Sequence, residues 1–446
     1  MNTPIYDFVR QYAASGVSRL HMPGHKGQAF LGCEQLDITE INGADSLYEA
    51  DGVILKSEQN AARLFGTQRT LYSTEGSSQC IRAMLHLCVT LRQKGMSNTI
   101  VAARNVHKAF IYAAALIGFD IVWLWPERMD SLCSCPVQPS TLRETLQKLP
   151  APPAAVYVTS PDYLGSMQDI RALADVCHAY GTLLAIDNAH GAYLHFTQPA
   201  RHPMDLGADI CCDSAHKTLS VLTGGAYLHL SPRLPAVFAQ QAKAAMAIYG
   251  STSPSYLTLC SLDLCNQYLA NTYPQALQQT AQSIARMRNE LLQAGWQLSH
   301  DEPLKITIHA AKCGIGGHDL ANRLRAGDVE CEYADPDDVV LMFTPQNSPE
   351  DITRLATTLG TPGEAALPRP RLSLPQGKQH VSVRSAIFAP QEIIPAKDAL
   401  GRICAAPTVG CPPAIPIVVS GEEITQEALA VFAYYGVQSV AVVSRI

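Results

Sequence analysis

The sequence predicts an α/β protein whose largest domain holds a mostly parallel, doubly wound sheet. Between about residues 66 and 230, short β-branched runs alternate with longer helical segments, which is the pattern of βαβ units. The chain has 446 residues, and chains divide into domains beyond about 250–300 residues, so we expect more than one core. Hydrophobic residues make up 47% and charged residues 16% of the chain, a composition that supplies a buried interior and excludes general disorder.

Seven short apolar runs are expected as strands of this sheet. They are residues 70–73, 99–103, 121–125, 155–159, 182–187, 210–213 and 225–230. Helices are expected at 77–91, 107–117 and 169–180, and a long helix at 268–292 leads out of the domain. Because ligands of open α/β sheets bind at the carboxyl ends of the strands, polar residues just after these runs are the candidates for chemistry.

The remainder of the chain predicts two smaller units. Segments at 304–310, 319–326, 339–344 and 349–359 alternate between strand and helix patterns, which indicates a small α/β domain. Residues 361–377 are rich in proline and glycine and form the clearest linker. We therefore expect three domains, at residues 1–275, 276–366 and 367–446.

Composition and charge narrow the function classes. Lys and Arg number 33 against 39 Asp and Glu, without a basic block, so nucleic acid is not an expected partner. The N-terminus lacks the layout of a secretory signal, and the longest apolar run, 109–119, is too short to span a bilayer. Fourteen cysteines in a chain of this kind indicate reduced, mostly buried thiols and a cytoplasmic protein.

A metal site is not expected. His21 and His25 have the spacing of two zinc ligands on a helix, but Pro23 and Gly24 lie between them and forbid that helix. The cysteines form no CxxC pair.

The first strand end with polar residues is the segment Tyr72-Ser-Thr-Glu-Gly-Ser-Ser, which opens a helix. Gly76 allows close approach of the backbone. Ser77 and Ser78 offer hydroxyl and N–H groups at the helix N-terminus, which is a favourable place for a phosphate. Serine at a helix start is more commonly only an N-cap, so for this motif alone both interpretations stay open.

Two further strand ends carry ionisable side chains. Asp187 ends an apolar run, where a carboxylate can keep a pyridinium nitrogen protonated, and Ala189 is small enough to lie under a flat ring. The alternative is a loop aspartate that forms an Asx turn. Lys217 follows the next strand, and a lysine flanked by apolar segments loses its proton more readily and attacks aldehydes. Ser214 and His216 could reach a phosphate beside it. The three strand ends together predict pyridoxal 5'-phosphate as the cofactor.

The motifs around these residues resemble the Orn/Lys/Arg decarboxylase family, in its short bacterial form without an N-terminal wing domain. The resemblance covers nearly the whole chain, and its most specific parts are HMPGHKG at 21–27 and SAHK at 214–217. The other matching segments are DITE at 37–40, EGSS at 75–78, RNVHK at 104–108, TSPDYLG at 159–165, DNAH at 187–190, RSAIFAPQE at 384–392, GRI at 401–403, PPAIP at 412–416 and GE at 421–422.

The resemblance implies a fold-type I pyridoxal-phosphate enzyme, similar to aspartate aminotransferase. It would have a large domain with a mostly parallel sheet, a small α/β domain and a C-terminal α+β domain. By position, Lys217 would bind the cofactor covalently, Asp187 would pair with its ring nitrogen, and His107 would stack on the ring face opposite Ala189. His190 would contact the ring oxygen or the substrate carboxylate. The phosphate would be held by Ser77, Ser78, Ser214 and His216. A homodimer or higher homo-oligomer, with the active site at the dimer interface, is also implied.

The resemblance implies decarboxylation of a basic amino acid (arginine, lysine or ornithine) to the corresponding amine and carbon dioxide, in polyamine-type metabolism. Lys217 or a nearby histidine would return a proton to the α-carbon. The distal cation of the substrate needs a carboxylate, for which Glu422 and Glu40 are candidates, although a solvated surface carboxylate is the simpler interpretation of each. Which of the three amino acids is used stays open.

This chain departs from the family at two places. Asn188 stands where the family often has glutamate, and CPPA at 411–414 stands where it often has YPPG, in the region that helps to select the distal group. The alternatives to decarboxylation are another pyridoxal-phosphate reaction, such as transamination, and a catalytically silent homologue.

Overall fold

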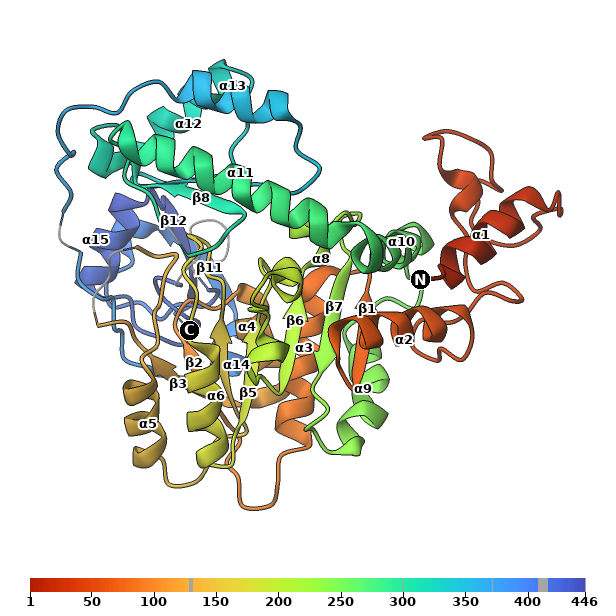
Figure 1. The fold of residues 1–446 in the computed structure, drawn as a ribbon. Helices are drawn as coiled ribbons and strands as arrows, with labels where there is room; N and C mark the ends of the chain where they lie inside the picture. The colour runs from red at the N-terminus through yellow and green to blue at the C-terminus, as the bar shows by residue number, and fades with distance from the viewer. Residues whose placement is uncertain (128–130, 300, 371, 408–415, 446) are drawn as a thin grey trace. The chain divides into compact units, whose positions relative to one another are not determined.

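The structure is a computed structural model, and it describes the chain apart from residues 128–130, 300, 371, 408–415 and 446 (Figure 1). The chain divides into two compact units. The first unit comprises Met1–Thr99, Leu146–Tyr157 and Asp169–Ala276, and the second comprises Ile100–Thr145, Val158–Gln168 and Leu277–Ile446. Both units are assembled from separate stretches of chain, and the division into three domains stays a prediction.

Seven strands form the principal sheet, in the order β1-β7-β6-β5-β4-β2-β3. Their bounds are β1 (Arg69–Ser73), β2 (Thr99–Ala103), β3 (Asp120–Leu124), β4 (Ala155–Thr159), β5 (Leu183–Asp187), β6 (Ile210–Asp213) and β7 (Ala226–Leu230). Strands β5 and β6 are parallel, whereas β7 runs antiparallel to both of its neighbours, β1 and β6. The expected α/β architecture with a mostly parallel sheet is confirmed. Every residue of β4, β6 and β7 is buried, which explains why these strands read as continuous apolar runs.

The first unit surrounds its strands with helices. The helices with all their residues in this unit are α1 (Pro4–Ala14), α2 (Val53–Phe65), α3 (Gly76–Thr90), α6 (Ile170–Ala179), α7 (Pro203–Leu206), α8 (Ala215–Thr218), α9 (Ala236–Ile248) and α10 (Tyr256–Asn271), with 3-10 turns η1 (Glu34–Leu36) and η3 (Ala192–Phe196). Helix α3 packs against β1, β5, β6 and β7, and α9 packs against α3. Since β1 and β6 are both antiparallel to β7, β1 runs in the same direction as β6. Helix α3 follows β1, so it begins on the side of the sheet where β6 ends.

Two helix predictions need correction. The single helix expected at 268–292 is wrong, because α10 ends at Asn271 and α11 (Tyr273–Gln293) begins two residues later. Pro274 explains the break, since proline lacks the N–H that a continuing helix requires but is favoured in a first turn. The helix expected at 107–117 is α4 (Lys108–Ala113) followed by a π-helical turn, η2 (Ala114–Gly118).

The second unit contains a small antiparallel sheet in the order β8-β10-β9. Its elements are β8 (Lys305–Ile308), β9 (Tyr333–Ala334), β10 (Val339–Met342), η4 (Ala310–Cys313), α12 (Gly317–Ala326) and α13 (Pro349–Leu359). Ile306, Ile308 and Leu341 form its core with Trp296. The expected alternation of strand and helix is confirmed here, apart from the two-residue strand β9, which is too short to leave a pattern in the sequence.

The described residues after 377 combine a two-stranded sheet with short helices. The elements are α14 (Val383–Phe388), β11 (Gln391–Pro395), η5 (Ala396–Asp398), α15 (Gln426–Tyr434) and β12 (Ser439–Val443). The remaining helix, α5 (Pro139–Lys148), precedes β4 in the sequence. Strands β11 and β12 pair antiparallel. The described part of 361–377 contains neither helix nor strand, as expected of a linker.

Two further expectations concern cysteines and membranes. The cysteines in the described residues are free thiols, and all of them except Cys33 are buried, which confirms the expectation of mostly buried thiols for those residues. None of the helices in the described part of the chain combines the length and the apolar character that crossing a bilayer requires.

Candidate functional site

Lys217 lies on the short helix α8, directly after the buried strand β6. Its side chain is half-buried, and its Nζ is 3.2 Å from His190 Nε2. His190 is itself buried and follows β5, the parallel neighbour of β6. The two parallel strands therefore bring an amine and an imidazole together, although 27 residues separate them in the sequence.

Asp187 is the last residue of β5 and is only 2% exposed. The Tyr157 hydroxyl donates to Asp187 Oδ2 at 3.0 Å, and the Ala189 N–H donates to Oδ1 at 3.2 Å. Burial raises the pKa of the Asp187 carboxyl, while the Lys217 amine and the Tyr157 hydroxyl act in the opposite direction. Tyr157 was not identified from the sequence, since it lies in the middle of β4 within an unbroken apolar run.

Two serines meet at the start of α3. Ser214 Oγ donates to Ser77 Oγ at 2.6 Å, and both side chains are buried. Gly76 adopts a φ of +70°, a left-handed conformation that glycine takes without strain, and its N–H donates to Gly224 O at 2.7 Å. Ser78 follows as a half-buried residue in the first turn of this 15-residue helix. The side chain of Glu75, at the N-cap position, makes no capping bond to the helix.

His216 and His107 each have a defined local role. His216 Nδ1 donates to Gly225 O at 3.0 Å, and burial lowers the pKa of the half-buried His216 ring. His107 is the N-cap of α4, where its Nδ1 accepts from the Ala109 N–H at 3.1 Å. His107 belongs to the second unit and Ala189 to the first, so the ring-stacking role of His107 stays a prediction.

The two carboxylates proposed for the substrate differ in exposure. Glu40 is exposed in the single chain, which agrees with its interpretation as a solvated surface carboxylate. Glu422 is 3% exposed, and its two oxygens accept from Arg104 Nη1 at 2.8 Å and Nη2 at 2.7 Å. The surface interpretation is therefore wrong for Glu422, because the guanidinium of Arg104 compensates the burial of its charge. A substrate cation would have to compete with Arg104 for this carboxylate. The departure at 411–414 lies outside the described residues.

Arg104 is held by aromatic rings as well as by Glu422. Its guanidinium carbon lies 4.7 Å from the ring centroid of Trp123 and 4.4 Å from that of Trp125. Such contacts between a cation and an aromatic face strengthen when water is excluded. Nothing in the spacing of the sequence links these four residues.

One group among the described residues has the composition of a metal site, namely His202, Cys211 and Asp213. All three are buried. However, His202 Nδ1 accepts from the Met204 N–H at 3.2 Å, so the proton of the neutral ring is on Nε2. That nitrogen is 3.0 Å from Asp213 Oδ2 and serves as a hydrogen-bond donor, which leaves it no lone pair for a metal. The geometry describes a hydrogen-bonded carboxylate.

The residues around Lys217 fit pyridoxal phosphate. A buried carboxyl whose pKa is raised is stabilised as an anion by a positive partner, and a protonated ring nitrogen would be such a partner for Asp187. The hydroxyls of Ser77 and Ser214 at a helix N-terminus suit a phosphate. The half-buried amine of Lys217 suits an aldehyde carbon.

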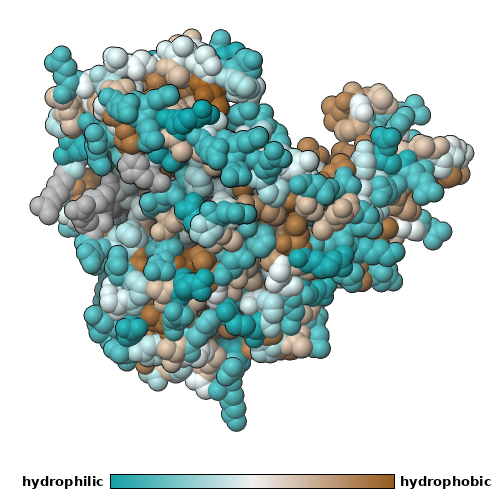
Figure 2. All heavy atoms as spheres, viewed as in Figure 1, coloured by the Kyte–Doolittle hydropathy of each residue, from teal (hydrophilic) through white to brown (hydrophobic). Residues whose placement is uncertain are grey.

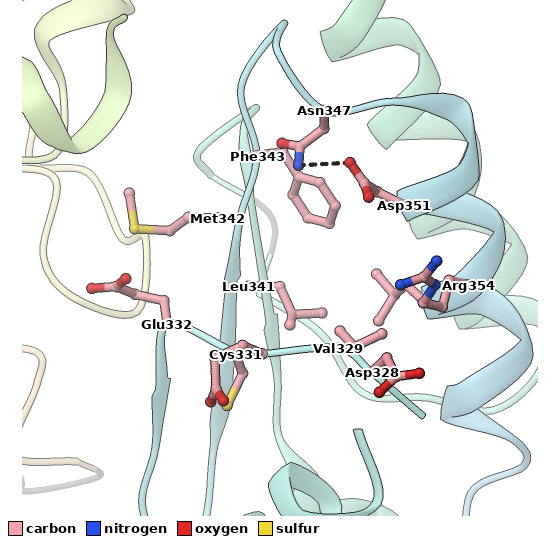
Figure 3. Close-up of a pocket in the computed structure, with 12 residues that line it drawn as sticks. Asp328, Val329, Cys331, Glu332, Leu341, Met342, Phe343, Asn347, Asp351 and Arg354 are labelled. Atoms are coloured by element: carbon pink, nitrogen blue, oxygen red, sulfur yellow. Dashed lines mark hydrogen bonds between the residues drawn. The ribbon is translucent and has the colours of Figure 1, made fainter. Parts of the chain in front are cut away.

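A cavity of about 350 Å³ lies between β10 and α13 and is drawn in Figure 3. Val329, Leu341 and Phe343 give it apolar walls, and none of the residues expected at the active site lines it. Of the four acidic residues that line it, Asp351 has a structural explanation, because Asp351 and Ser348 form the capping box of α13. The strand ends that carry Asp187 and Lys217 therefore remain the candidate site.

Comparisons with known proteins point in the same direction. A family model described as "Orn/Lys/Arg decarboxylase, major domain" matches residues 3–311. The chain is 29% identical over 463 residues to an arginine decarboxylase of Bacillus subtilis (strain 168), an alignment that covers 96% of this chain and 92% of that protein.

Two solved structures share the fold. Lysine decarboxylase A from Pseudomonas aeruginosa gives a TM-score of 0.80 at 18% identity and covers 97% of this chain and 75% of its own. The lysine decarboxylase of Francisella novicida gives a TM-score of 0.78 at 16% identity and covers 99% of this chain and 81% of its own.

Proposed function

Because the chain belongs to the Orn/Lys/Arg decarboxylase family, we propose that it decarboxylates a basic amino acid, with pyridoxal 5'-phosphate as cofactor, at the strand ends that carry Asp187, His190 and Lys217. The observation that carries this assignment is the 3.2 Å approach of Lys217 Nζ to His190 Nε2. Burial raises the pKa of the Asp187 carboxyl, and the charge of the Lys217 amine offsets part of that rise. An amine, a proton-transferring imidazole and a carboxylate are the groups that this chemistry requires.

Each side chain has a separate task in this proposal. Pyridoxal phosphate supplies an electron sink for the electron pair left behind when carbon dioxide departs. Lys217 would hold the cofactor through its side-chain amine. Asp187 keeps a proton on the ring nitrogen, which is electrostatic stabilisation by a preorganised group. His190 can hold a proton beside Lys217 Nζ, and either group can return one to the α-carbon.

The phosphate would be held by hydroxyl groups at the N-terminus of α3. Ser77 and Ser214 are already in contact, so two hydroxyls are preorganised there. We include Ser78 and His216 in the same cradle. The lowered pKa of His216 indicates a neutral ring near pH 7 before a dianionic phosphate binds. A phosphate within reach of His216 would favour its protonated form.

The substrate would be arginine, lysine or ornithine, and the product an amine of polyamine-type metabolism. Arginine is the first substrate to test, because the chain aligns over 96% of its length with an arginine decarboxylase. Glu40 remains a candidate for the distal group of the substrate. Glu422 is a weaker candidate because Arg104 already occupies both of its carboxylate oxygens.

A second copy of this chain is the proposed partner, in a homodimer or higher homo-oligomer. Exposed large apolar side chains gather in the N-terminal segment, where Leu20 is 94%, Phe30 83% and Leu31 89% exposed. Apolar atoms are visible over the segment that carries α1 in Figure 2. Several exposed apolar side chains in one segment are consistent with an interface. We further propose the cytoplasm as the compartment, since free thiols persist in reducing environments.

The proposal is tested by incubating the purified protein, loaded with pyridoxal phosphate, with each basic amino acid and measuring amine and carbon dioxide. Equal amounts of the two products from one of the three substrates are expected, with none from Lys217→Ala. A keto acid in place of the amine would identify a transaminase. Bound cofactor without any product would identify a silent homologue.

A further inference from the structure

The buried carboxylate of Asp213 joins five elements of the first unit. Asp213 is the last residue of β6 and is fully buried. His229 Nε2, on β7, is 3.1 Å from Asp213 Oδ2, and His202 Nε2, at the start of α7, is 3.0 Å from the same atom. His229 Nδ1 in turn lies 2.8 Å from Thr70 Oγ1 on β1. The fifth element is the segment after β5, which contributes Asn188.

Asn188 makes the contact that matters for the active site. Its side-chain Nδ2 donates to Asp213 Oδ1 at 2.7 Å, and its backbone N–H donates to Cys212 O at 2.9 Å. The side chain is fully buried. A Cβ placed on Gly191 would clash with Asn188 Oδ1, so a glycine at position 191 leaves room for the Asn188 amide where it lies.

The carboxylate of Asp213 is surrounded by hydrogen-bond donors. Burial alone would raise the pKa of Asp213, but its interactions with His202 and His229 outweigh burial and lower that pKa well below its usual range, which favours the ionised form. Burial lowers the pKa of His229, while the interaction with Asp213 acts in the opposite direction. An ionised carboxylate accepts hydrogen bonds and cannot donate one, so it requires donors around it. An amide at position 188 supplies a donor, whereas a carboxylate there would place like charges against each other.

Both partners of this contact are direct neighbours of cofactor-site residues. Asn188 stands between Asp187 and Ala189, and Asp213 precedes Ser214. A change in the contact between Asn188 and Asp213 would therefore move the ring side and the phosphate side of the site relative to each other. Even a small movement of this kind would matter, because catalytic groups must be held within a fraction of an ångström of their working positions.

We propose that Asp213 and Asn188 are positioning residues, matched to each other, which fix the C-terminal ends of β5 and β6 and so set Asp187 against Ser214 and Lys217. This inference rests on the proposed function, because it takes the strand ends as the cofactor site. It also gives a structural reason for asparagine at position 188. The two residues do not touch the reacting atoms in this account; they act through their neighbours.

The test measures the dissociation constant for pyridoxal phosphate, the circular dichroism of the bound cofactor, and the melting temperature of the protein without cofactor. Asp213→Asn should raise the dissociation constant on the order of tenfold and change the dichroism, because a charge-assisted hydrogen bond is lost. Asp209→Asn is the matched control. Asp209 is a buried carboxylate at the opposite end of the same strand, 3.0 Å from His178 Nε2, and its replacement should lower the melting temperature without changing either cofactor signal.

Three further variants keep the test decisive if Asp213→Asn does not fold. Asn188→Ala removes the same hydrogen bond without changing a charge and should weaken cofactor binding in the same way. Asn188→Asp should weaken it further, and the exchange Asn188→Asp with Asp213→Asn should recover part of the loss. Wild-type cofactor binding and dichroism in the Asp213 and Asn188 variants, or equal effects from Asp209→Asn, would overturn the inference. Wild-type protein that binds the cofactor but forms no amine would instead contradict the proposed function alone.

Discussion

At the scale of a single residue, Asp187 combines a contact typical of a turn with the proposed role as partner of the ring nitrogen. Asp187 accepts from both Tyr157 and the Ala189 N–H, and the second bond is the one that an Asx turn would make. The two interpretations of the sequence, ring partner and loop residue, are therefore compatible in one side chain. Only the ring partner requires the negative charge.

We predict that Asp187→Asn and Asp187→Ala both reduce the turnover rate on the order of 10²–10³-fold, since a preorganised charge is lost in each. Turnover would be measured as amine release at saturating substrate. Asn188→Ala should reduce turnover less, because it acts through position. If Asp187→Asn retained full activity while Asp187→Ala lost it, the residue would serve only as a turn former.

Residue types at strand ends could be predicted from the sequence, whereas their partners could not. Asp187, Ser214 and Lys217 follow apolar runs, and buried strands of parallel sheets are recognisable as such runs. The contacts between Tyr157 and Asp187 and between Asn188 and Asp213 join residues 30 and 25 positions apart, on different strands. Register between strands decides them, and no local pattern encodes that register.

At the scale of elements, the N-terminus of α3 is the proposed phosphate site. Ser77→Ala should raise the dissociation constant for pyridoxal phosphate about tenfold, because one hydroxyl donor is lost. The constant would be measured by titrating the protein without cofactor. Thr90→Ala, at the opposite end of the same helix, is the control and should leave the constant unchanged. Equal effects from the two variants would argue that helix stability, and not a phosphate contact, is responsible.

The loop between β9 and β10 makes stability depend on pH. Burial, followed by the charge of Asp338, raises the pKa of Asp335 to about 6. The folded state thus favours the protonated form, and the stability that Asp335 contributes at low pH is lost as pH rises through about 6. Asparagine cannot ionise. Asp335→Asn should therefore gain on the order of 2 kcal/mol in unfolding free energy relative to wild type between pH 4 and pH 7.

Denaturant unfolding of both proteins at a series of pH values checks this prediction. Asp351→Asn is a control of opposite sign, because the Ser348 N–H lowers the pKa of Asp351 and its contribution is lost as pH falls. A constant difference between Asp335→Asn and wild type across this range would contradict the raised pKa of Asp335.

How well the ends of a helix could be predicted depended on the residues that mark them in the sequence. Helix α13 was predicted with its observed bounds because Ser348, Pro349 and Asp351 mark its start and Gly360 follows its end. The break between α10 and α11 was missed because helical periodicity continues on both sides of it.

For the whole molecule, the pair of Arg104 and Glu422 links residues 318 positions apart within the second unit. Removing one partner of a buried ion pair leaves an uncompensated charge, so Glu422→Ala should cost about 3–5 kcal/mol of unfolding free energy. Unfolding by denaturant measures this cost. Glu423→Ala is the control, since Glu423 pairs with His380 on the surface and should matter little. Equal stability of the two variants, with a raised KM only for Glu422→Ala, would indicate that Glu422 binds the substrate.

The family and the cofactor could be predicted from the sequence, because short motifs such as SAHK resemble those of the family along nearly the whole chain. The motifs could not indicate that Glu422 is buried against Arg104, since that depends on how residues after 377 pack on the end of β2.

The most direct test of the central claim is to reduce the cofactor-loaded protein with borohydride, digest it and locate the attached cofactor by mass spectrometry. The cofactor should be found on Lys217 and nowhere in Lys217→Ala. Attachment to a different lysine, or to none in the wild-type protein, would contradict the account.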